Sequence, residues 1–257
     1  GIHMKLQGNT ILITGGGTGI GLSLAEAFVK EGNKVLISGR RLEKLEEAQK
    51  KVPGLELFQG DVGNAEGVKT LAEKVISAHP EINVLINDAG VAEYRNITVT
   101  EEDLENLTYE FDINVKGPIR MNSAFMDTLK KNKGTIINVS SGLAFVPLIA
   151  MPIYCATKAA IHSYTITLRQ QLEGMVEVIE LAPPTVKTEM TDKFADGEGG
   201  FPLLTTEELT AATLKGIKAG KKLITPGQSS QLLFMSRLAP GFIQGQLKKG
   251  GTPFIPA

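Results

Sequence analysis

The chain has 257 residues, of which 42% are hydrophobic and 21% are charged, and its formal net charge is −1. This length allows one or two domains with a large core. The near-neutral charge argues against nucleic acid as the main partner, because phosphate binding requires an excess of basic residues. No apolar run reaches about 18 residues and no charged-then-apolar leader is present, so we expect a soluble, untargeted chain.

Cys155 is the single cysteine, which excludes an internal disulfide and fits a reducing compartment. Residues 1–4 have the character of a cloning-tag remnant followed by a natural start at Met4, and we leave them out of the expected fold. We therefore predict a cytoplasmic protein whose domain begins at residue 5.

The first element in the chain is a short apolar strand over residues 9–14, which is followed by a glycine-rich turn of pattern T-G-x-x-x-G-I-G. Apolar residues then recur at helical spacing. Glycines at a strand-to-helix turn let the backbone approach a pyrophosphate, which the helix N-terminus attracts. The candidate phosphate-binding residues are Gly15, Gly17, Thr18, Gly19, Ile20 and Gly21.

The second strand, over residues 35–38, ends at Gly39 and Arg40. An acid about 20 residues after the glycines would bind the ribose 2′-hydroxyl of NAD, whereas an arginine suits the 2′-phosphate of NADP. Gly39 stands where the acid would be and Arg40 follows it, so we predict NADP rather than NAD as the cofactor. The alternative is that Arg40 and Arg41 only begin a solvated helix, with an inner stripe formed by Leu42, Leu45 and Ala48.

Strands and helices alternate from there to residue 225. Further strands are expected at residues 55–58, 84–86, 135–139, 176–181 and 223–225. Helices are expected at residues 64–78, 101–116 and 206–219. Another helix is expected after residue 116 and ends near residue 131. Nearly continuous apolar strands between helices predict an α/β single-domain Rossmann fold over residues 5–250, a doubly wound, mostly parallel sheet with helices on both faces. Such folds bind ligands at the carboxyl ends of their strands.

Tyr154 and Lys158 stand four residues apart in a segment that follows Pro152 and has no glycine until Gly174. We expect a helix here, and residues i and i+4 share one face of a helix. An ammonium ~4 Å from the phenol would favour the phenolate by ~4 kcal/mol at an effective dielectric of ~20, which lowers the phenol pKa by ~3. Such a tyrosine could act as an acid or base near neutral pH. For this pattern alone, the alternative is an ordinary amphipathic helix.

Two segments near the end of the chain lie outside this alternation. Residues 189–204 follow a strand and are rich in glycine, and we predict a substrate lid there. Residues 228–257 form a C-terminal tail whose apolar residues we expect to pack on the same domain or on a partner subunit. Membrane-surface binding by the tail is the less favoured alternative, because its basic residues are few for an anionic lipid: Arg237, Lys248 and Lys249.

Together these motifs resemble the short-chain dehydrogenase/reductase family, in its short single-domain subclass. They lie within residues 9–188 in the family's order and approximate spacing, and only the set as a whole is specific. The matching features are the glycine-rich turn, Asn87, Ala89, Gly90, Asn114, Ser141 and Y-x-x-x-K. The stretch S-G-L-A-F-x-P-L from Ser141, with Y-C-A-T-K-A-A and E-x-A-P-P, further resembles the DltE-like oxidoreductases.

The resemblance implies a role for each matching residue. Tyr154 would protonate a carbonyl oxygen, or deprotonate an alcohol in the reverse direction, and Lys158 would lower the pKa of Tyr154 and bind the nicotinamide ribose. Ser141, rather than the adjacent Ser140, would hold the substrate oxygen, and Asn114 would fix a water. The other implied cofactor contacts are Asp61 and Val62 at the adenine, Val186 and Thr188 at the carboxamide, and Asn87, Ala89 and Gly90.

Two residues depart from the family's pattern. Asp88 stands where a second asparagine is usual, and Pro184 stands where a glycine is usual, which removes an N–H and stiffens the backbone near the nicotinamide. Neither change touches the four implied catalytic residues.

We therefore expect an NADP-dependent carbonyl reductase or alcohol dehydrogenase that acts on a small molecule. A hydroxyl and a phenol directed at an oxygen that gains negative charge would stabilise the transition state. The alternative is a cofactor-binding sensor or scaffold without turnover. A largely apolar substrate pocket is suggested by Leu143, Phe145, Met151, Met190 and Phe201.

We also expect a homodimer or homotetramer that pairs through the helices over residues 115–131 and 153–173. These segments carry more small and apolar residues than one core-facing stripe requires. The residues concerned are Met121, Phe125, Ala159, Ala160 and Ile161. Members of the resembled family usually pair through these two helices.

Overall fold

The computed structural model describes residues 1–188 and 202–257. In this part of the chain, seven strands form one sheet in the order β3-β2-β1-β4-β5-β6-β7, and neighbouring strands are parallel. The strands are β1 (Thr10–Thr14), β2 (Lys34–Gly39), β3 (Glu56–Gln59), β4 (Val84–Asn87), β5 (Thr135–Val139), β6 (Glu177–Leu181) and β7 (Leu223–Ile224). The predicted doubly wound parallel sheet is therefore confirmed.

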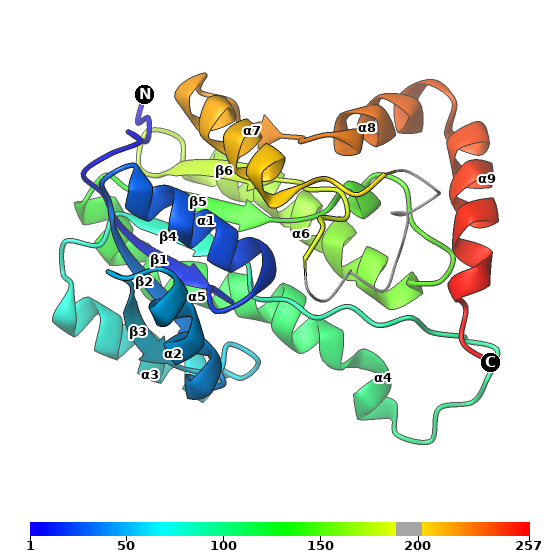
Figure 1. Cartoon of the computed structure of the whole chain (residues 1–257), viewed down its shortest axis with the longest axis horizontal. Coiled ribbons are helices and arrows are strands. Elements are labelled where there is room, and N and C mark those ends of the chain that lie inside the picture. Colours follow the sequence, from blue (N-terminus) through cyan, green and yellow to red (C-terminus); the bar gives the residue numbers. More distant parts are fainter. Residues whose placement is uncertain (189–201) are drawn as a thin grey trace.

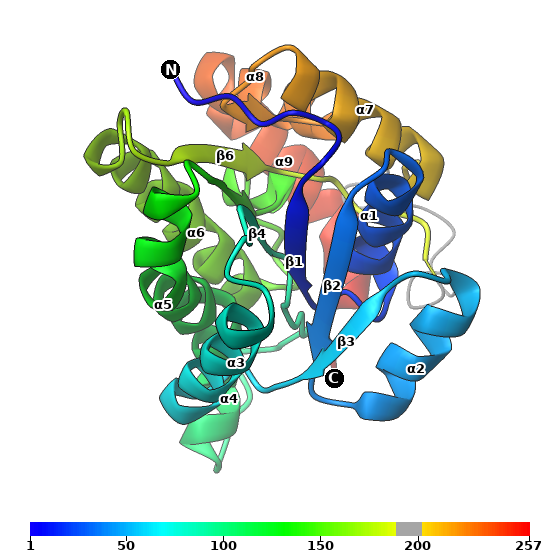
Figure 2. The same cartoon turned by 90° about the vertical axis from the view of Figure 1, so that its left-hand side faces the viewer.

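Helices cover both faces of this sheet (Figure 2). One face carries α1 (Gly19–Lys30), α2 (Leu42–Lys51) and α7 (Thr206–Lys218). The other carries α3 (Ala65–Ala78), α5 (Gly117–Lys131) and α6 (Pro152–Gln171). Among the described residues, the remaining helices are α4 (Leu104–Phe111), α8 (Gln228–Leu238), α9 (Pro240–Gly251), a π-helical turn (Asp112–Lys116) and two short 3-10 turns (Gly142–Ala144 and Thr252–Phe254).

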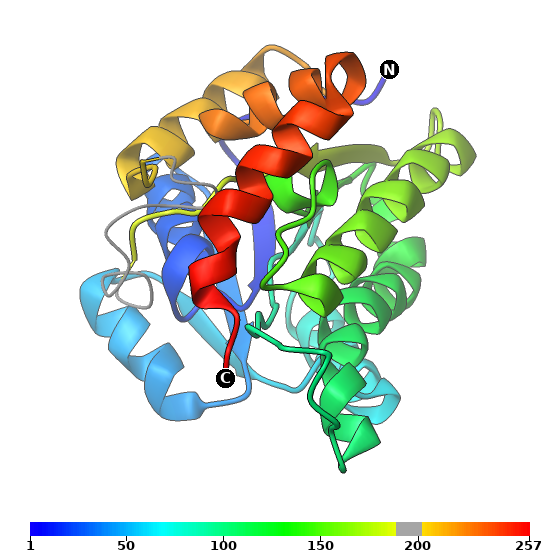
Figure 3. The same ribbon diagram turned by 90° about the vertical axis from the view of Figure 1, so that its right-hand side faces the viewer.

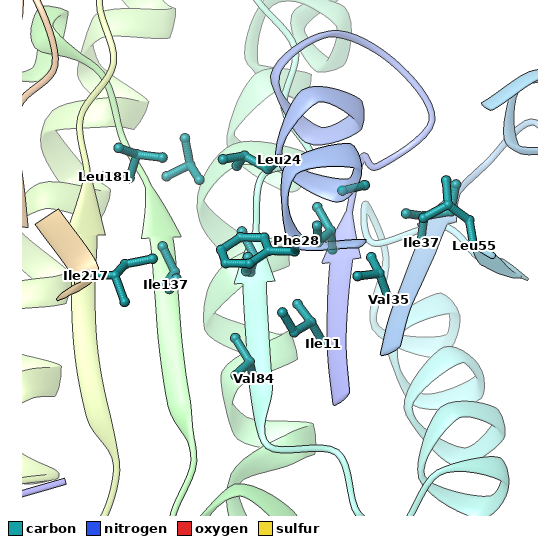
Figure 4. Packing of buried hydrophobic residues seen from close by; sticks show 14 of the residues in the cluster. Ile11, Leu24, Phe28, Val35, Ile37, Leu55, Val84, Ile137, Leu181 and Ile217 are labelled. Carbon is teal, nitrogen blue, oxygen red and sulfur yellow. The ribbon is translucent and has the colours of Figure 1, made fainter. Parts of the chain in front are cut away.

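Alternation along the buried strands divides the core into two layers. In β1, Ile11 and Ile13 face α1, whereas Leu12 faces α3 and α5. Figure 4 shows Phe28 of α1 packed over this first layer, where it is fully buried. Burial of a side chain of this kind contributes ~1.5–3 kcal/mol. The central strands β1, β4 and β5 are buried along their whole length, which fits their mainly apolar sequences.

The last helices form a further layer at the end of the sheet to which the strands' carboxyl ends point (Figure 1). Figure 3 shows α9 from the side on which this layer lies. Leu232 of α8 and Leu247 of α9 are buried against the loop that follows β5. The chain end then reaches the loop after β4, where Phe254 stacks on Tyr94 with 5.6 Å between ring centroids. The C-terminal tail thus packs on its own domain.

Three expectations need correction. The helix expected over residues 101–116 begins at Leu104 and becomes π-helical at Asp112. Leu42 lies at the start of α2, where 41% of it is exposed, so it is not part of the inner stripe that Leu45 and Ala48 form.

The third correction concerns the residues offered as evidence for self-association. Met121, Phe125 and Ile161 are buried within the single chain, so they belong to the core and are not surplus to it. Of the predicted residues, Ala159 is exposed and Ala160 is partly exposed. The large apolar side chains exposed on the same two helices are Ile119 and Ile166, with about two-fifths of each accessible. Within the described residues, no helix is long and apolar enough to cross a membrane.

Candidate active site

The glycine-rich turn between β1 and α1 lies close to the end of β4. Gly15 has a φ of 65°, and a Cβ on it would lie 2.8 Å from Cα of Ala89. A Cβ on Gly21 would collide with the Gly15 carbonyl oxygen. Only glycine fits at these two positions, because the backbone folds on itself there to begin α1. The turn leaves the N-terminus of α1 open to an anionic group.

A pocket lies beside this turn. The pocket is lined by half of the predicted cofactor-binding residues, which are Gly15, Gly17, Thr18, Arg40, Asp61, Val62, Ala89 and Gly90. The other predicted cofactor-binding residues lie outside the lining of this pocket, and they are Gly19, Ile20, Gly21, Asn87, Tyr154, Lys158, Val186 and Thr188. The lining residues therefore follow the carboxyl ends of four neighbouring strands, β3, β2, β1 and β4.

Three basic side chains stand at the end of β2 where the pocket opens. Arg40 and Arg41 line it, and neither forms an ion pair with a carboxylate of residues 1–188 or 202–257. Lys44, one turn into α2, lines it as well and pairs with Glu47 at 3.3 Å. Lys44 is not among the predicted residues, because only the fold of α2 brings it to the pocket. These cations and the glycine turn fit the phosphates of a dinucleotide.

Thr14, the last residue of β1, holds the turn that follows β4. Its hydroxyl oxygen accepts the N–H groups of Asp88 and Ala89, both at 3.1 Å. These two bonds set the backbone of the Ala89–Gly90 segment against the glycine-rich turn. Thr14 opens the T-G-x-x-x-G-I-G pattern but is not among the predicted binding residues, and its role here is to brace the turn after a neighbouring strand.

Asn87 lies beneath the pocket and not in its lining. Its amide group is buried and donates to Oδ1 of Asn122 at 2.7 Å and to Oδ1 of Asn138 at 2.9 Å. Asn138 in turn donates to Thr165 of α6 at 3.0 Å. The asparagines therefore tie β4 to α5, β5 and α6, and direct contact of Asn87 with a cofactor stays a prediction.

Asn114 occupies the centre of the π-helical turn between α4 and α5, a geometry that often marks functional positions. Its side chain accepts the N–H of Val91 at 2.9 Å and donates to the Val91 carbonyl at 2.8 Å. It also donates to the hydroxyl of Thr157 at 3.1 Å. Thr157 is the neighbour of Lys158, so Asn114 links the loop after β4 to the helix that carries the Y-x-x-x-K motif.

Tyr154 and Lys158 lie on one face of α6, as their spacing predicts. The Lys158 Nζ lies 5.6 Å from the centroid of the Tyr154 ring and donates to the Val139 carbonyl at 3.1 Å. Burial lowers the pKa of Lys158 to about 8, although the Asp88 carboxylate raises it. The ammonium is therefore largely retained at neutral pH, beside the Tyr154 ring.

The structure distinguishes the two serines at the end of β5. The Ser140 hydroxyl donates to the buried Glu180 carboxylate at 2.6 Å, and His162 contacts the same carboxylate through Nδ1 at 2.8 Å. The Ser141 hydroxyl oxygen instead accepts the N–H of Leu143 at 3.0 Å, which leaves its proton available for another acceptor. Ser141 is thus the better placed of the two to donate to a substrate oxygen. The Glu180–His162 pair was not anticipated from the sequence.

The segment that follows β6 returns to the start of α1. Val186 is buried with Leu204 and Leu209, and Ile20 packs against this group. Pro183, just before the second departure from the family pattern, accepts the N–H of Gly142 at 2.9 Å through its carbonyl. The ends of β5 and β6 are therefore linked. Most of the predicted lid, including Met190 and Phe201, lies outside the described residues.

Tyr154 is partly buried against an apolar cluster. Leu143 and Met151 are buried in it, and Leu232, Leu247 and other residues of the last helices complete it. Phe145 is partly buried there and meets the His162 ring edge-on at 5.1 Å between centroids. The surroundings of Tyr154 are thus largely apolar, while its own helix supplies a cation. Within the described residues, no group of acidic, histidine and cysteine side chains is arranged to bind a metal.

Comparisons with known proteins agree with this geometry. The family described as short chain dehydrogenase matches residues 9–199. The uncharacterized oxidoreductase DltE of Bacillus subtilis is 40% identical over 225 residues, which are 86% of this chain and 89% of that protein. A serine 3-dehydrogenase of Rhizobium radiobacter is 33% identical, over 71% of this chain and 74% of that protein.

A solved structure of a short chain dehydrogenase also matches this chain in its fold. A short chain dehydrogenase from Burkholderia cenocepacia, in complex with NADP, has a TM-score of 0.82 and 28% sequence identity. The match covers 95% of this chain and 99% of that one.

Proposed function

Because this chain belongs to the short-chain dehydrogenase family, we propose that it is an NADP-dependent oxidoreductase that interconverts a carbonyl compound and a secondary alcohol. The observation that carries the proposal is the buried Lys158 ammonium beside the Tyr154 ring, next to the end of β5. An activated phenol has no evident use in a protein that only binds a nucleotide.

The residues around the glycine-rich turn fit a dinucleotide. A Cβ at Gly15 would clash with the backbone of Ala89, so glycine is required for this close contact. Arg40 and Arg41, which pair with no carboxylate among the described residues, offer positive charge at the pocket. We assign the phosphates to the glycine-rich turn, the adenosine to Asp61 and Val62, and the nicotinamide side to Lys158, Val186 and Thr188. A nicotinamide bound there would supply or accept the hydride.

The protein's own part in the reaction is to hold a proton and to bind an oxygen. Tyr154 would give its phenolic proton to the carbonyl oxygen of the substrate, and the nearby Lys158 ammonium would stabilise the phenolate that remains. Ser141 would donate a hydrogen bond to the same oxygen as negative charge develops on it. Asn114, which contacts Thr157 beside Lys158, would support the route by which Tyr154 regains the proton that it gave to the substrate.

The apolar cluster around Tyr154 favours a substrate with a substantial apolar portion. Leu143, Met151 and the last two helices surround the ring, and burial of apolar surface would favour ketones and secondary alcohols over small polar ones. We further propose that Arg40 makes NADPH the preferred cofactor, and that the protein acts as a homo-oligomer.

A panel of ketones, aldehydes and secondary alcohols, tested with NADPH or NADP⁺, tests this function by the change in cofactor absorbance. We expect turnover of at least one apolar ketone or alcohol, and faster turnover with NADP(H) than with NAD(H). Tight NADPH binding without turnover of any member of the panel would contradict the proposal and favour a nucleotide sensor.

A further inference from the structure

The turn that follows β5 carries Ser141 and is attached to the segment at the end of β6. The Ser140 N–H donates to the Leu181 carbonyl at 2.8 Å, and the Gly142 N–H donates to the Pro183 carbonyl at 2.9 Å. Because these two bonds flank Ser141, the position of its hydroxyl depends on how firmly the neighbouring elements hold the turn.

A series of side-chain bonds holds the same turn from α6. The Ser140 hydroxyl donates to Oε2 of Glu180 at 2.6 Å, and the His162 Nδ1 lies 2.8 Å and 2.9 Å from the two oxygens of that carboxylate. Because carboxylate oxygens only accept, Nδ1 is the donor in this contact. Ser140 and Glu180 are buried, so water does not compete for these bonds.

His162 also contacts the other end of the turn. Its ring packs edge-to-face with the Phe145 ring, with 5.1 Å between centroids. Phe145 directly follows the 3-10 turn Gly142–Ala144. One side chain of α6 therefore holds the turn both at Ser140, before Ser141, and at Phe145, after it.

We propose that His162 is a positioning residue for the reaction, which acts through Glu180 and Phe145 to hold the turn after β5 so that the Ser141 hydroxyl is directed at the substrate oxygen. The inference rests on the proposed role of Ser141, but the effect of His162 on the turn can be measured without turnover. Cofactor affinity should not depend on His162, because the lining of the proposed cofactor pocket includes neither this side chain nor the turn.

Hydrogen exchange at the Leu143 amide, followed by NMR, reports on this turn directly. The amide N–H bonds the Ser141 hydroxyl oxygen at 3.0 Å, and Leu143 is buried. We expect His162→Leu to speed exchange of this amide about tenfold, the effect of losing about one hydrogen bond from the turn. His162→Asn keeps an N–H donor near the position of Nδ1 and should restore most of the protection.

His79→Leu is the matched control for loss of stability alone. His79 also contacts a glutamate, with Nε2 2.7 Å from Glu56, and it packs edge-to-face with Phe58 at 6.1 Å between centroids. It lies at the end of α3, before β4 begins, and therefore at the opposite edge of the sheet from the turn after β5. Equal exchange rates at the Leu143 amide in His162→Leu and His79→Leu overturn the inference.

Kinetics with a substrate from the panel test the effect on the reaction. His162→Leu should lower kcat about 10- to 100-fold, because a small misplacement of a positioned group has effects of this size, and NADPH affinity should stay the same. His162→Asn should recover most of the lost kcat. An unchanged kcat in His162→Leu, or an equal loss of kcat in His79→Leu, contradicts the proposal. If no substrate is turned over, the proposed function fails, and exchange at the Leu143 amide still decides whether His162 holds the turn.

Ser140→Ala covers the case in which His162→Leu does not fold, because it removes one hydroxyl and leaves the contact of His162 with the carboxylate in place. It should speed exchange at the same amide and lower kcat. Ser229→Ala is its control, since the Ser229 hydroxyl is buried, would lie 2.7 Å from a Cβ on Gly142, and bonds no other described residue. Equal results for the two serine variants contradict the proposal.

Discussion

The proposed cofactor side of the site is built from consecutive strand–turn–helix units, whereas the proposed substrate side is assembled from segments far apart in the chain. The pocket lining follows the ends of β1 to β4 and ends at Ile113. The cluster around Tyr154 instead combines Tyr94, the turn after β5, and the last two helices. A site made of backbone turns can be encoded locally, but a site made of side chains from distant segments requires the whole fold.

The largest expected effect lies at Tyr154, where the two sides meet. Tyr154→Phe keeps the ring in its apolar cluster but removes the transferable proton, so turnover should fall ~10²–10⁴-fold. Steady-state kinetics with a substrate from the panel, together with NADPH fluorescence for binding, checks this. The fold and NADPH affinity should be retained, which would show that the two sides work separately.

Tyr164→Phe is the matched control for that variant. It removes a phenolic hydroxyl from the same helix, where the hydroxyl accepts a bond from Asn122 at 3.2 Å, and it leaves Lys158 untouched. The tyrosine assignment is wrong if Tyr154→Phe turns over at the unmodified rate, or if Tyr164→Phe loses as much activity.

The next largest effect is expected from the substrate side alone. Leu247 of α9 is fully buried in the cluster around Tyr154, and Leu247→Ala should lower the free energy of unfolding by ~2–5 kcal/mol. Urea denaturation measures this. At temperatures where the variant stays folded, NADPH affinity should be unchanged while turnover falls.

Leu238→Ala provides the comparison, because Leu238 is 68% exposed on α8 and its loss should change the free energy of unfolding by less than ~0.5 kcal/mol. Equal losses in the two variants would mean that α9 does not form part of the core described above.

The smallest of the three effects concerns cofactor choice at the other side. Arg40→Asp removes a cation from the pocket and introduces an acid that can bind a ribose hydroxyl. NADPH binding should weaken by ~1.5–3 kcal/mol, with NADH becoming the preferred cofactor. Titration of both cofactors by fluorescence measures the change.

Arg237→Asp makes the same charge change on α8, away from the pocket, and should leave the ratio of the two affinities as it was. Equal affinity of the unmodified protein for NADPH and NADH would refute the role given to Arg40, whatever the variant does.

The sequence by itself determined the sheet, the cofactor-binding turn and the pairing of Tyr154 with Lys158. These follow from short-range rules, since strands buried on both faces are continuously apolar, a crowded turn accepts only glycine, and residues four apart share a helix face. The identity of Arg40 as a pocket residue followed in the same way, from its place directly after a strand.

Only the tertiary structure decided which side chains pack against, and hydrogen-bond to, the sheet, the turn and the Tyr154–Lys158 pair. It buried Met121 and Phe125 in the core, turned the Asn87 amide away from the pocket, and brought Lys44 to it. It also bonded the Ser140 hydroxyl to Glu180, which leaves Ser141 the better placed of the two serines to bind a substrate oxygen. The physical reason is that packing and hydrogen bonding join residues from different strands and helices, and local spacing carries no record of which elements become neighbours.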